Sequence, residues 1–294
     1  MVGRRLLFDQ GTSTVHRPDD SYARRRAILR ETVEALTPPS ARQRHHQRAQ
    51  ANLARWKQQR SDADGSGCEV WIEAGDWGEV TLDVTRARGE LFAVLNMANA
   101  YVPGGGYVEG CPAQEENMFR RTDCHFSVTE AHMDPHTERY VSHMSALLNA
   151  QDGRVHLDVE HPRVCIRGTE DRDAEDLGYR WLADEEIFPF LELRAAAVDL
   201  RGGLAFDPDE MERRIRAQFV TLAAHDVRHV VLSAFGCGAF RNPAFEVARL
   251  YREVLEDVRR GLTCVVFAIF NPGYGPDNYT PFVEAFDGLS RRRL

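Results

Sequence analysis

The chain has 294 residues, enough for one large domain or two small ones, and its hydrophobic content of 43% is ordinary for a globular protein. A net charge of −8 excludes the global basic field of a nucleic-acid binder, so no direct nucleic-acid binding is expected. No apolar run reaches the ~18 residues of a membrane-spanning helix, and the first ten residues lack the apolar core of a secretory signal. Six cysteines without CxxC spacing suit a reducing compartment. These features predict a cytoplasmic protein without membrane contact, and we expect a monomer.

Two helices are predicted near the start of the chain. Residues 1–18 are expected to be poorly ordered. An apolar pattern with helical spacing runs over residues 19–36, and Pro38-Pro39 stops it. Ser40 is expected to cap a second helix over residues 41–60, whose arginines and histidines indicate a solvated face.

The segment Ser61–Gly67 has the composition of a linker. We therefore divide the chain into an N-terminal helical extension, residues 1–64, and a main domain, residues 65–294. In the main domain strands and helices alternate, which predicts an α/β three-layer fold with a mixed, mostly parallel sheet. Strands are expected at 69–73, 91–98, 163–168, 191–199, 229–235 and 263–270. Helices are expected at 80–88, 114–122, 137–149, 208–226, 243–260 and 279–287. In the fifth, Asn242 is expected to be the capping residue and Pro243 the first helical residue.

The stretch from Leu95 to Asp123 combines a strand end, a glycine loop and a helix start that carries two carboxylates. Gly104, Gly105 and Gly106 lack Cβ atoms, so their backbone can adopt positive φ and approach a ligand closely. Gln114-Glu115-Glu116 then places two carboxylates beside the N–H groups of a helix start. A glutamate pair in a first helical turn is common for that reason alone, and the adjacent glycines are what indicate a binding site with an acid attached.

This stretch resembles the bacterial-type poly(ADP-ribose) glycohydrolases of the macrodomain superfamily. That family carries three glycines, a spacer of six to eight residues, and then Gln-Glu-Glu; here the spacer Tyr107–Ala113 has seven. The segment Asn96–Asn99 looks like the macrodomain Asn-x-x-Asn that ends a core strand. The resemblance covers roughly residues 65–290 and implies a macrodomain-like fold, with ADP-ribose or an ADP-ribosylated protein as the partner.

The resemblance also assigns roles to single residues. It implies that Glu116 is the acid and base of glycoside hydrolysis, and that Glu115 holds the ribose 2″ hydroxyl. Asn96 and Asn99 become substrate-binding candidates, and Gln114 would support the loop. Adjacent carboxylates in a partly buried site repel, which raises one pKa and favours the acid role. Water is the only co-reactant needed, so no cofactor and no metal are expected.

A second loop, Gly236-Cys237-Gly238-Ala239-Phe240, follows another apolar run and precedes a helix. Successive backbone N–H groups at such a turn form an anion-binding nest. The loop looks like the diphosphate-binding loop of the same family, in which an aromatic at the position of Phe240 sits against the distal ribose and phosphates. Cys237 has no His or Asp in a suitable local context, which favours a structural role over a nucleophilic one. Because both loops follow core strands, we expect them to meet at one edge of the sheet.

Two aspartates leave alternatives open. Asp123 is a third carboxylate after Glu115 and Glu116, and it is a catalytic candidate because an extra acid can pair with a guanidinium leaving group. That reading favours hydrolysis of arginine-linked mono-ADP-ribose; the alternative is that Asp123 ends the helix or binds an arginine. Asp76 follows the first strand, where macrodomains often place an adenine-contacting aspartate.

Three function classes remain at this point. The first is an ADP-ribosyl glycohydrolase acting on the polymer or on arginine-linked mono-ADP-ribose. The second is a non-catalytic ADP-ribose reader, which the glutamate pair disfavours. The third, a nucleotide-dependent transferase, is disfavoured because the chain has no Walker loop and no Rossmann fingerprint after the first strand.

Overall fold

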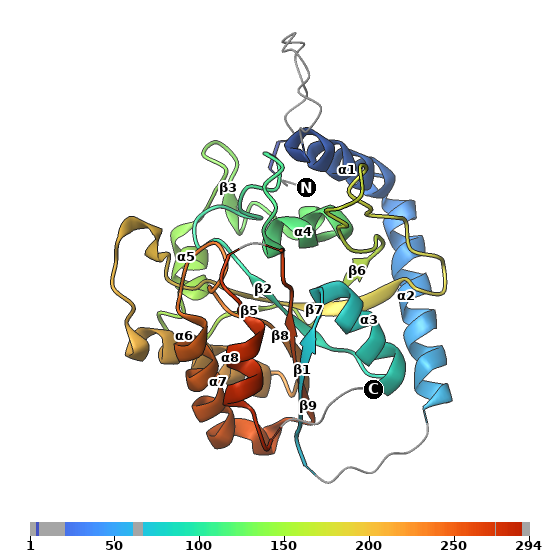
Figure 1. Cartoon of the computed structure of the whole chain (residues 1–294). Coiled ribbons are helices and arrows are strands. Elements are labelled where there is room, and N and C mark those ends of the chain that lie inside the picture. Colours follow the sequence, from blue (N-terminus) through green and yellow to red (C-terminus); the bar gives the residue numbers. More distant parts are fainter. Residues whose placement is uncertain (1–3, 6–20, 61–66, 274, 290–294) are drawn as a thin grey trace.

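The computed structural model describes residues 4–5, 21–60, 67–273 and 275–289. Within them a seven-stranded mixed sheet has the order β1-β9-β8-β2-β7-β5, with β6 also pairing with β7 (Figure 1). All pairs from β1 to β7 in this order are parallel, and β5 and β6 run antiparallel to β7. The strands are β1 (Glu69–Ala74), β2 (Ala93–Met97), β5 (His156–Leu157), β6 (Arg163–Cys165), β7 (Phe188–Ala195), β8 (His229–Leu232) and β9 (Cys264–Ile269), and a separate hairpin joins β3 (Met133–Asp134) to β4 (Arg139–Tyr140).

Helices cover both faces of the sheet, so the predicted three-layer α/β fold is confirmed (Figure 1). The fold places α6, α7 and α8 against one face and α1 to α4 against the other. The helices are α1 (Ser21–Leu36), α2 (Pro39–Gln59), α3 (Trp77–Arg88), α4 (Gln114–Arg121), α5 (Ser142–Leu148), α6 (Pro208–Ala224), α7 (Ala244–Val258) and α8 (Tyr279–Ala285), with short 3₁₀ segments η1 (Cys124–Ser127), η2 (Leu200–Gly202) and η3 (Arg259–Gly261).

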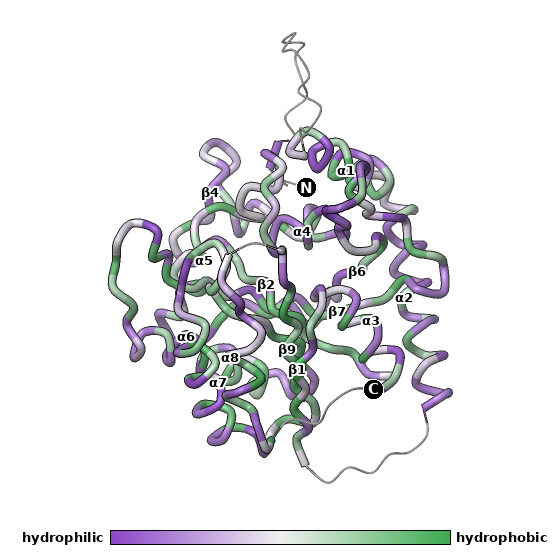
Figure 2. Tube along the Cα trace, in the orientation of Figure 1, coloured by the Kyte–Doolittle hydropathy of each residue, from purple (hydrophilic) through white to green (hydrophobic). Residues whose placement is uncertain are grey.

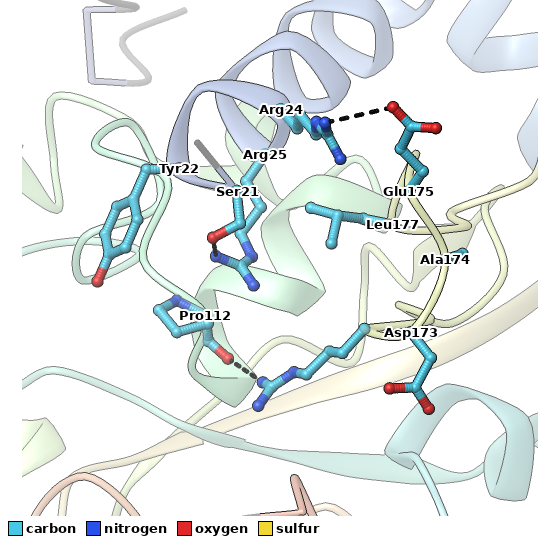
Figure 3. A pocket seen from close by; sticks show the side chains of 10 residues that line it. Ser21, Tyr22, Arg24, Arg25, Pro112, Asp173, Ala174, Glu175 and Leu177 are labelled. Atoms are coloured by element: carbon cyan, nitrogen blue, oxygen red, sulfur yellow. Dashed lines mark hydrogen bonds and ion pairs between the residues drawn. The ribbon is translucent and has the colours of Figure 1, made fainter. Parts of the chain in front are cut away.

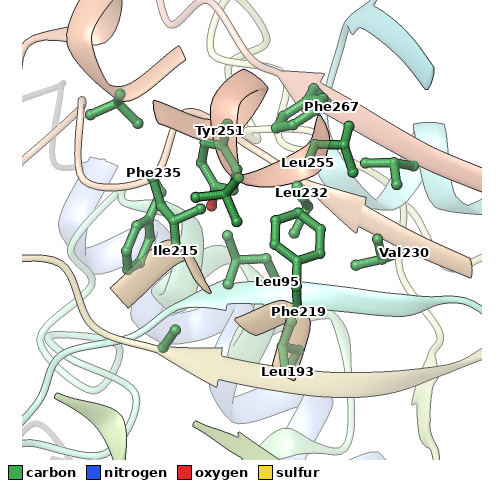
Figure 4. Close-up of a cluster of buried hydrophobic side chains, with 14 of the residues drawn as sticks. Leu95, Leu193, Ile215, Phe219, Val230, Leu232, Phe235, Tyr251, Leu255 and Phe267 are labelled. Atoms are coloured by element: carbon green, nitrogen blue, oxygen red, sulfur yellow. The ribbon is translucent and has the colours of Figure 1, made fainter. Parts of the chain in front are cut away.

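Each face of the sheet has its own apolar core. On the α6–α8 side, Phe235, Tyr251 and Phe267 pack among aliphatic side chains from the strands (Figure 4). On the other side, Trp71, Phe92 and aromatic residues of the neighbouring helices fill the space. The strands at the centre of the sheet are mostly apolar and the outer helices are mostly polar (Figure 2), the pattern of a parallel sheet buried on both faces.

The N-terminal helices pack directly on the core. The Thr32 hydroxyl of α1 donates to the carbonyl of Arg120 in α4 at 2.7 Å. The Arg25 guanidinium pairs with buried Glu170 at 2.6 Å. In α2 the Asn52 amide donates to the carbonyl of Ile187 at the start of β7 at 2.8 Å. The division of the chain at residue 64 remains a prediction. Helix α1 packs against α4, the helix whose first turn carries the two glutamates.

Several local predictions were wrong. Ser40 does not cap α2: Pro38 is the N-cap and Pro39 is the first helical residue, because a proline at that position needs no N–H partner. Asn242 does not cap α7 either; Pro243 does, while the Asn242 amide donates to the carbonyls of Val198 and Gly236. The segment predicted as a helix over 137–149 begins as β4, and only residues 142–148 are helical. Residues 1–3 and 6–18 and most of the linker lie outside the described residues.

Candidate active site

The two loops singled out by sequence leave neighbouring parallel strands. Ala93 of β2 pairs with Val230 of β8, and Val94 with Val231. Because both strands run in the same direction, the glycine loop after β2 and the loop after β8 emerge at the same edge, as predicted. From there the chain passes to α4 on one face and to α7 on the other. Such a divergence opens a crevice at the strand ends where ligands bind in α/β sheets.

Backbone N–H groups of the glycine loop hold both glutamate side chains. The Glu115 carboxylate accepts from the N–H of Asn99 at 2.7 Å and from the N–H of Gly104 at 3.1 Å. The Glu116 carboxylate accepts from the N–H of Gly106 at 2.9 Å. Both side chains are at least nine-tenths buried. These hydrogen bonds therefore fix the positions of both carboxylates relative to the glycine loop.

Two neighbouring polar residues shape this part of the site. The Gln114 side chain accepts from the N–H of Met97 at 3.0 Å and donates to the carbonyl of Leu95 at 2.9 Å, which ties the start of α4 to the end of β2. The Asn99 side-chain oxygen accepts from the N–H groups of Tyr101 and Val102. In the described part of the chain the Asn99 NH₂ group has no partner, so it is the donor left for a ligand.

Burial changes the acid–base properties of the pair. Desolvation raises the pKa of Glu115 well above its ordinary value, and the neighbouring charge of Glu116 adds to the effect. Desolvation also raises the pKa of Glu116, while the hydrogen bond from the Gly106 N–H opposes the rise. The pair is therefore poised to hold a proton closer to neutral pH than free carboxylates do, which is what a general acid requires.

A side chain at Gly105 would collide with the two glutamates themselves. Its φ is +56°, and a Cβ built there would lie 2.5 Å from Oε1 of Glu116 and 3.1 Å from Oε2 of Glu115. We expect Gly105→Ala to push the glutamates out of place and lower kcat by about 100-fold, since a displacement of about 1 Å can have that effect. Gly153→Ala is the matched control, because Gly153 has a φ of +69° with nothing within 4 Å of the added methyl. Steady-state kinetics of both variants test this, and equal losses would contradict it.

The second loop is anchored at its base and open at its tip. Gly236 has a φ of +75°, and a Cβ there would meet Ala197 at 2.4 Å. Cys237 is 1% exposed, and burial raises the pKa of its thiol, so its environment is that of a structural cysteine. Gly238 and Ala239 are exposed, Phe240 is half-buried, and a Cβ on Gly238 would meet nothing within 4 Å. The exposed turn is thus accessible to an anion.

Sequence reasoning missed Arg201, which lies beside this loop. Its guanidinium is 5.3 Å from the ring centroid of Phe240 and forms a bidentate pair with Asp199. The N–H of Leu200 donates to the Phe240 carbonyl at 3.0 Å, which joins the two segments. No signal around residue 200 pointed to this, because the segment reaches the loop only through tertiary packing.

Two predicted site residues are turned away from the glutamates. Asn96 is fully buried, and its amide donates to Glu192 of β7 at 2.8 Å. Asp123 lies just past the opposite end of α4, where its carboxylate accepts from the N–H of Val164 at 2.9 Å and contacts His46 Nε2 at 2.8 Å. A helix rises about 1.5 Å per residue, so the end of α4 at Arg121 lies about 7 Å along the helix axis from Glu116, and Asp123 follows it. Among the described residues, neither side chain has a hydrogen bond to Glu115 or Glu116.

Asp76 caps α3 and carries a buried ion pair. Its Oδ1 accepts from the N–H groups of Gly78 and Glu79 and from the Arg121 guanidinium at 2.5 Å. Arg121 is stacked 4.7 Å from the ring of Trp77. The side chain therefore already has a structural role, and its predicted adenine contact remains a prediction.

A cavity of about 640 Å³ lies between α1 and the segment around residues 172–177, with Pro112 of the spacer before α4 in its lining (Figure 3). None of the predicted site residues lines it. Three of its charged groups are paired with their surroundings: Arg24 with Glu175, Arg25 with Glu170, and Arg172 with the carbonyl of Pro112. We do not assign this cavity to the chemistry.

The fold is macrodomain-like, and the glutamate pair lies at the edge of the sheet where the two loops leave β2 and β8. Residues 24–150 match the family model for the microbial-type PARG, catalytic domain, where PARG stands for poly(ADP-ribose) glycohydrolase. The predicted resemblance to that family is confirmed over this part of the chain. Among the described residues no helix is long and apolar enough to cross a membrane.

Solved structures of bacterial glycohydrolases share the fold. One is the poly(ADP-ribose) glycohydrolase from Thermomonospora curvata bound to the inhibitor ADP-HPD, with 24% identity, a TM-score of 0.61, and coverage of 89% of this chain and 99% of that one. Another is the enzyme from Deinococcus radiodurans in complex with ADP-ribose, with 21% identity, a TM-score of 0.53, and coverage of 84% and 92%. A comparison with curated proteins gave no significant match.

Proposed function

We propose that this protein is a poly(ADP-ribose) glycohydrolase, a glycosidase that hydrolyses the ribose C1″ bond of ADP-ribose chains. The observation that carries the proposal is the pair of buried glutamates whose carboxylates are held by N–H groups of a glycine loop at the ligand-binding edge. The match of residues 24–150 to the microbial-type family supports the same activity.

In the proposed mechanism Glu116 acts first as an acid and then as a base. Protonated Glu116 gives its proton to the leaving oxygen as the C1″–O bond breaks, and positive charge develops on the ribose ring. The carboxylate that remains removes a proton from water as the water oxygen bonds to C1″, which restores the protonated acid. Glu115 accepts hydrogen bonds from the ribose hydroxyls and fixes the sugar, with the Asn99 amide as a further donor.

The second loop binds the nucleotide part of the ADP-ribose substrate. The exposed N–H groups around Gly238 and Ala239 receive the diphosphate, and the half-buried Phe240 packs against the distal ribose. Phosphates suit this place because an N–H nest and the start of α7 are electropositive. Gly236, Cys237 and Gly104–Gly106 shape the two loops rather than offer side chains.

The geometry favours the ribose–ribose bond of the polymer over an arginine linkage. The arginine alternative depended on Asp123 as an extra acid, and that carboxylate is held by Val164 and His46 at the far end of α4.

A non-catalytic reader has no need of two buried carboxylates that repel each other, because such a pair opposes folding unless a function retains it.

Two substrates distinguish these functions. ADP-ribose release is measured from a poly(ADP-ribosyl)ated protein and from a protein carrying arginine-linked mono-ADP-ribose, with wild type and Asp123→Asn side by side. We expect release from the polymer, and equal activity of Asp123→Asn on it once folding is matched. Release from the arginine substrate alone would overturn the polymer assignment. Tight ADP-ribose binding without release from either substrate would leave a reader.

A further inference from the structure

One peptide group of the glycine loop, between Gly105 and Gly106, touches Glu116 at one end and an arginine at the other. Its N–H, on Gly106, donates to Glu116 Oε1 at 2.9 Å. Its carbonyl, on Gly105, accepts from Nη1 of Arg4 at 2.6 Å. Arg4 stands 101 positions earlier in the sequence, so the contact joins the start of the chain to the proposed acid.

The neighbouring peptides of the loop are held by the backbone itself. The N–H of Gly105 donates to the carbonyl of Val102 at 3.0 Å, that of Tyr107 to Gly104 at 3.1 Å, and that of Cys111 to Gly106 at 3.0 Å. Among the hydrogen bonds of the described residues, the Gly105–Gly106 peptide alone in this turn is held at both ends by side chains. Glycines flank it on both sides, so no Cβ resists its rotation. A rotated peptide would present its carbonyl to the Glu116 carboxylate.

Arg4 is itself firmly positioned. Its guanidinium donates to Glu109 at 2.7 Å and to Glu138 at 3.3 Å, and the side chain is 10% exposed. The backbone N–H of Arg5 also donates to Glu138, at 3.1 Å. Charge-assisted hydrogen bonds of this kind are the stronger ones in proteins. Arg4 therefore has enough partners to hold the carbonyl in one orientation.

We propose that Arg4 is a positioning residue for the reaction, which fixes the Gly105–Gly106 peptide so that its N–H points at Glu116 and orients the acid. The inference rests on the role of Glu116 given above. The carbonyl is drawn to the guanidinium, and the N–H on the same peptide plane is thereby directed at the carboxylate. Arg4 acts through this peptide and does not touch the substrate.

Removal of Arg4 has a predictable effect on the acid. The other ionisable groups around Glu116 are Glu115, Glu109, Cys111, Arg120 and Arg201. The Gly106 N–H opposes the rise in the pKa of Glu116 because it stabilises the ionised form. Without Arg4 the peptide turns freely, that stabilisation is lost, and the pKa of Glu116 rises further. Since the first step needs protonated Glu116, the fall of activity on the alkaline side moves to higher pH.

The test compares Arg4→Ala with Arg5→Ala in the full chain. Arg5→Ala is the matched control because only the Arg5 backbone N–H makes the described contact. For Arg4→Ala on poly(ADP-ribose) we expect kcat to fall about 10- to 100-fold, with KM within about threefold of wild type. The alkaline limb of the pH–rate profile should shift upward, and added methylguanidinium should restore part of kcat. Arg5→Ala should match wild type in all four measurements.

Other outcomes separate this inference from the proposed function. Wild-type kcat and pH profile in Arg4→Ala, with Glu116→Gln inactive, would overturn the positioning role and leave the function intact. Full activity of Glu116→Gln would overturn the function itself. A lower kcat with an unshifted pH profile and no methylguanidinium response would mean that Arg4 merely stabilises the loop, which the melting temperature of the variant would also show.

Discussion

Glu116→Gln is expected to lower kcat on poly(ADP-ribose) by about 1,000-fold or more, because one side chain serves as acid in the first step and as base in the second. The amide keeps the size of the carboxyl group but cannot transfer a proton. The N–H of Gly106 can still donate to the side-chain oxygen of the amide, so the loop should keep its shape. ADP-ribose affinity is therefore expected to stay within about threefold of wild type, which separates lost chemistry from lost binding.

Glu115→Gln provides a contrast within the same pair. Its side chain accepts from two backbone N–H groups, of Asn99 and Gly104, and is proposed to bind the ribose. We expect this variant to raise KM as well as lower kcat. Glu212→Gln, a half-exposed glutamate on α6 paired with Arg216, is the control for loss of a charge. Near-wild-type turnover by Glu116→Gln would mean that another group donates the proton, and Glu115 would be the first to examine.

The elements that carry a local signal were predicted well from the sequence. The glycines, the Gln-Glu-Glu helix start and the apolar runs of β2 and β8 each depend on nearby residues, and the pairing of those strands brought their loops together. Asp123 shows why the rest could not be predicted. Spacing along the chain placed it near the glutamates, but its partners, Val164 and His46, come from β6 and α2. Arg4 and Arg201 were missed for the same reason, since each reaches the site through contacts between distant segments.

The contacts of Glu192 and Arg194, a charged pair of β7 inside the sheet, were also not predicted from the sequence. Their positions were predicted to lie in a strand, and both residues are 1% exposed. The Arg194 guanidinium donates to both Glu192 oxygens, at 2.7 and 2.8 Å, and to the Ser127 hydroxyl at 2.5 Å. The Asn96 amide donates to the same glutamate. The pair thus lies on the strand next to β2, beside the end from which the glycine loop begins.

Glu192→Gln is expected to lower the free energy of unfolding by about 3–5 kcal/mol, because removing one partner leaves Arg194 buried without a counter-charge. Glu186→Gln is the matched control. Hydrogen bonds from Arg180 lower the pKa of Glu186 to about 2, but that pair is open to solvent, with 63% of the arginine and 24% of the glutamate side chain accessible. An exposed pair contributes about 0–1 kcal/mol. Urea unfolding of both variants measures the difference, and similar losses would show that burial does not govern the effect.

The pH dependence of stability follows from the same pair. Burial alone would raise the pKa of Glu192, but Arg194 outweighs burial and lowers it to about 2, against an ordinary value of 4.5. A carboxyl group with a lowered pKa stabilises the fold above its unfolded pKa and ceases to do so as pH falls toward the folded value. Wild type should therefore lose up to about 3 kcal/mol between pH 4.5 and 2 through this residue. Glu192→Gln should lack that part of the slope. If the acid-unfolding curves of the variant and of wild type are parallel, the acid sensitivity comes from other residues. The pair would then orient β2 through Asn96 without contributing to stability.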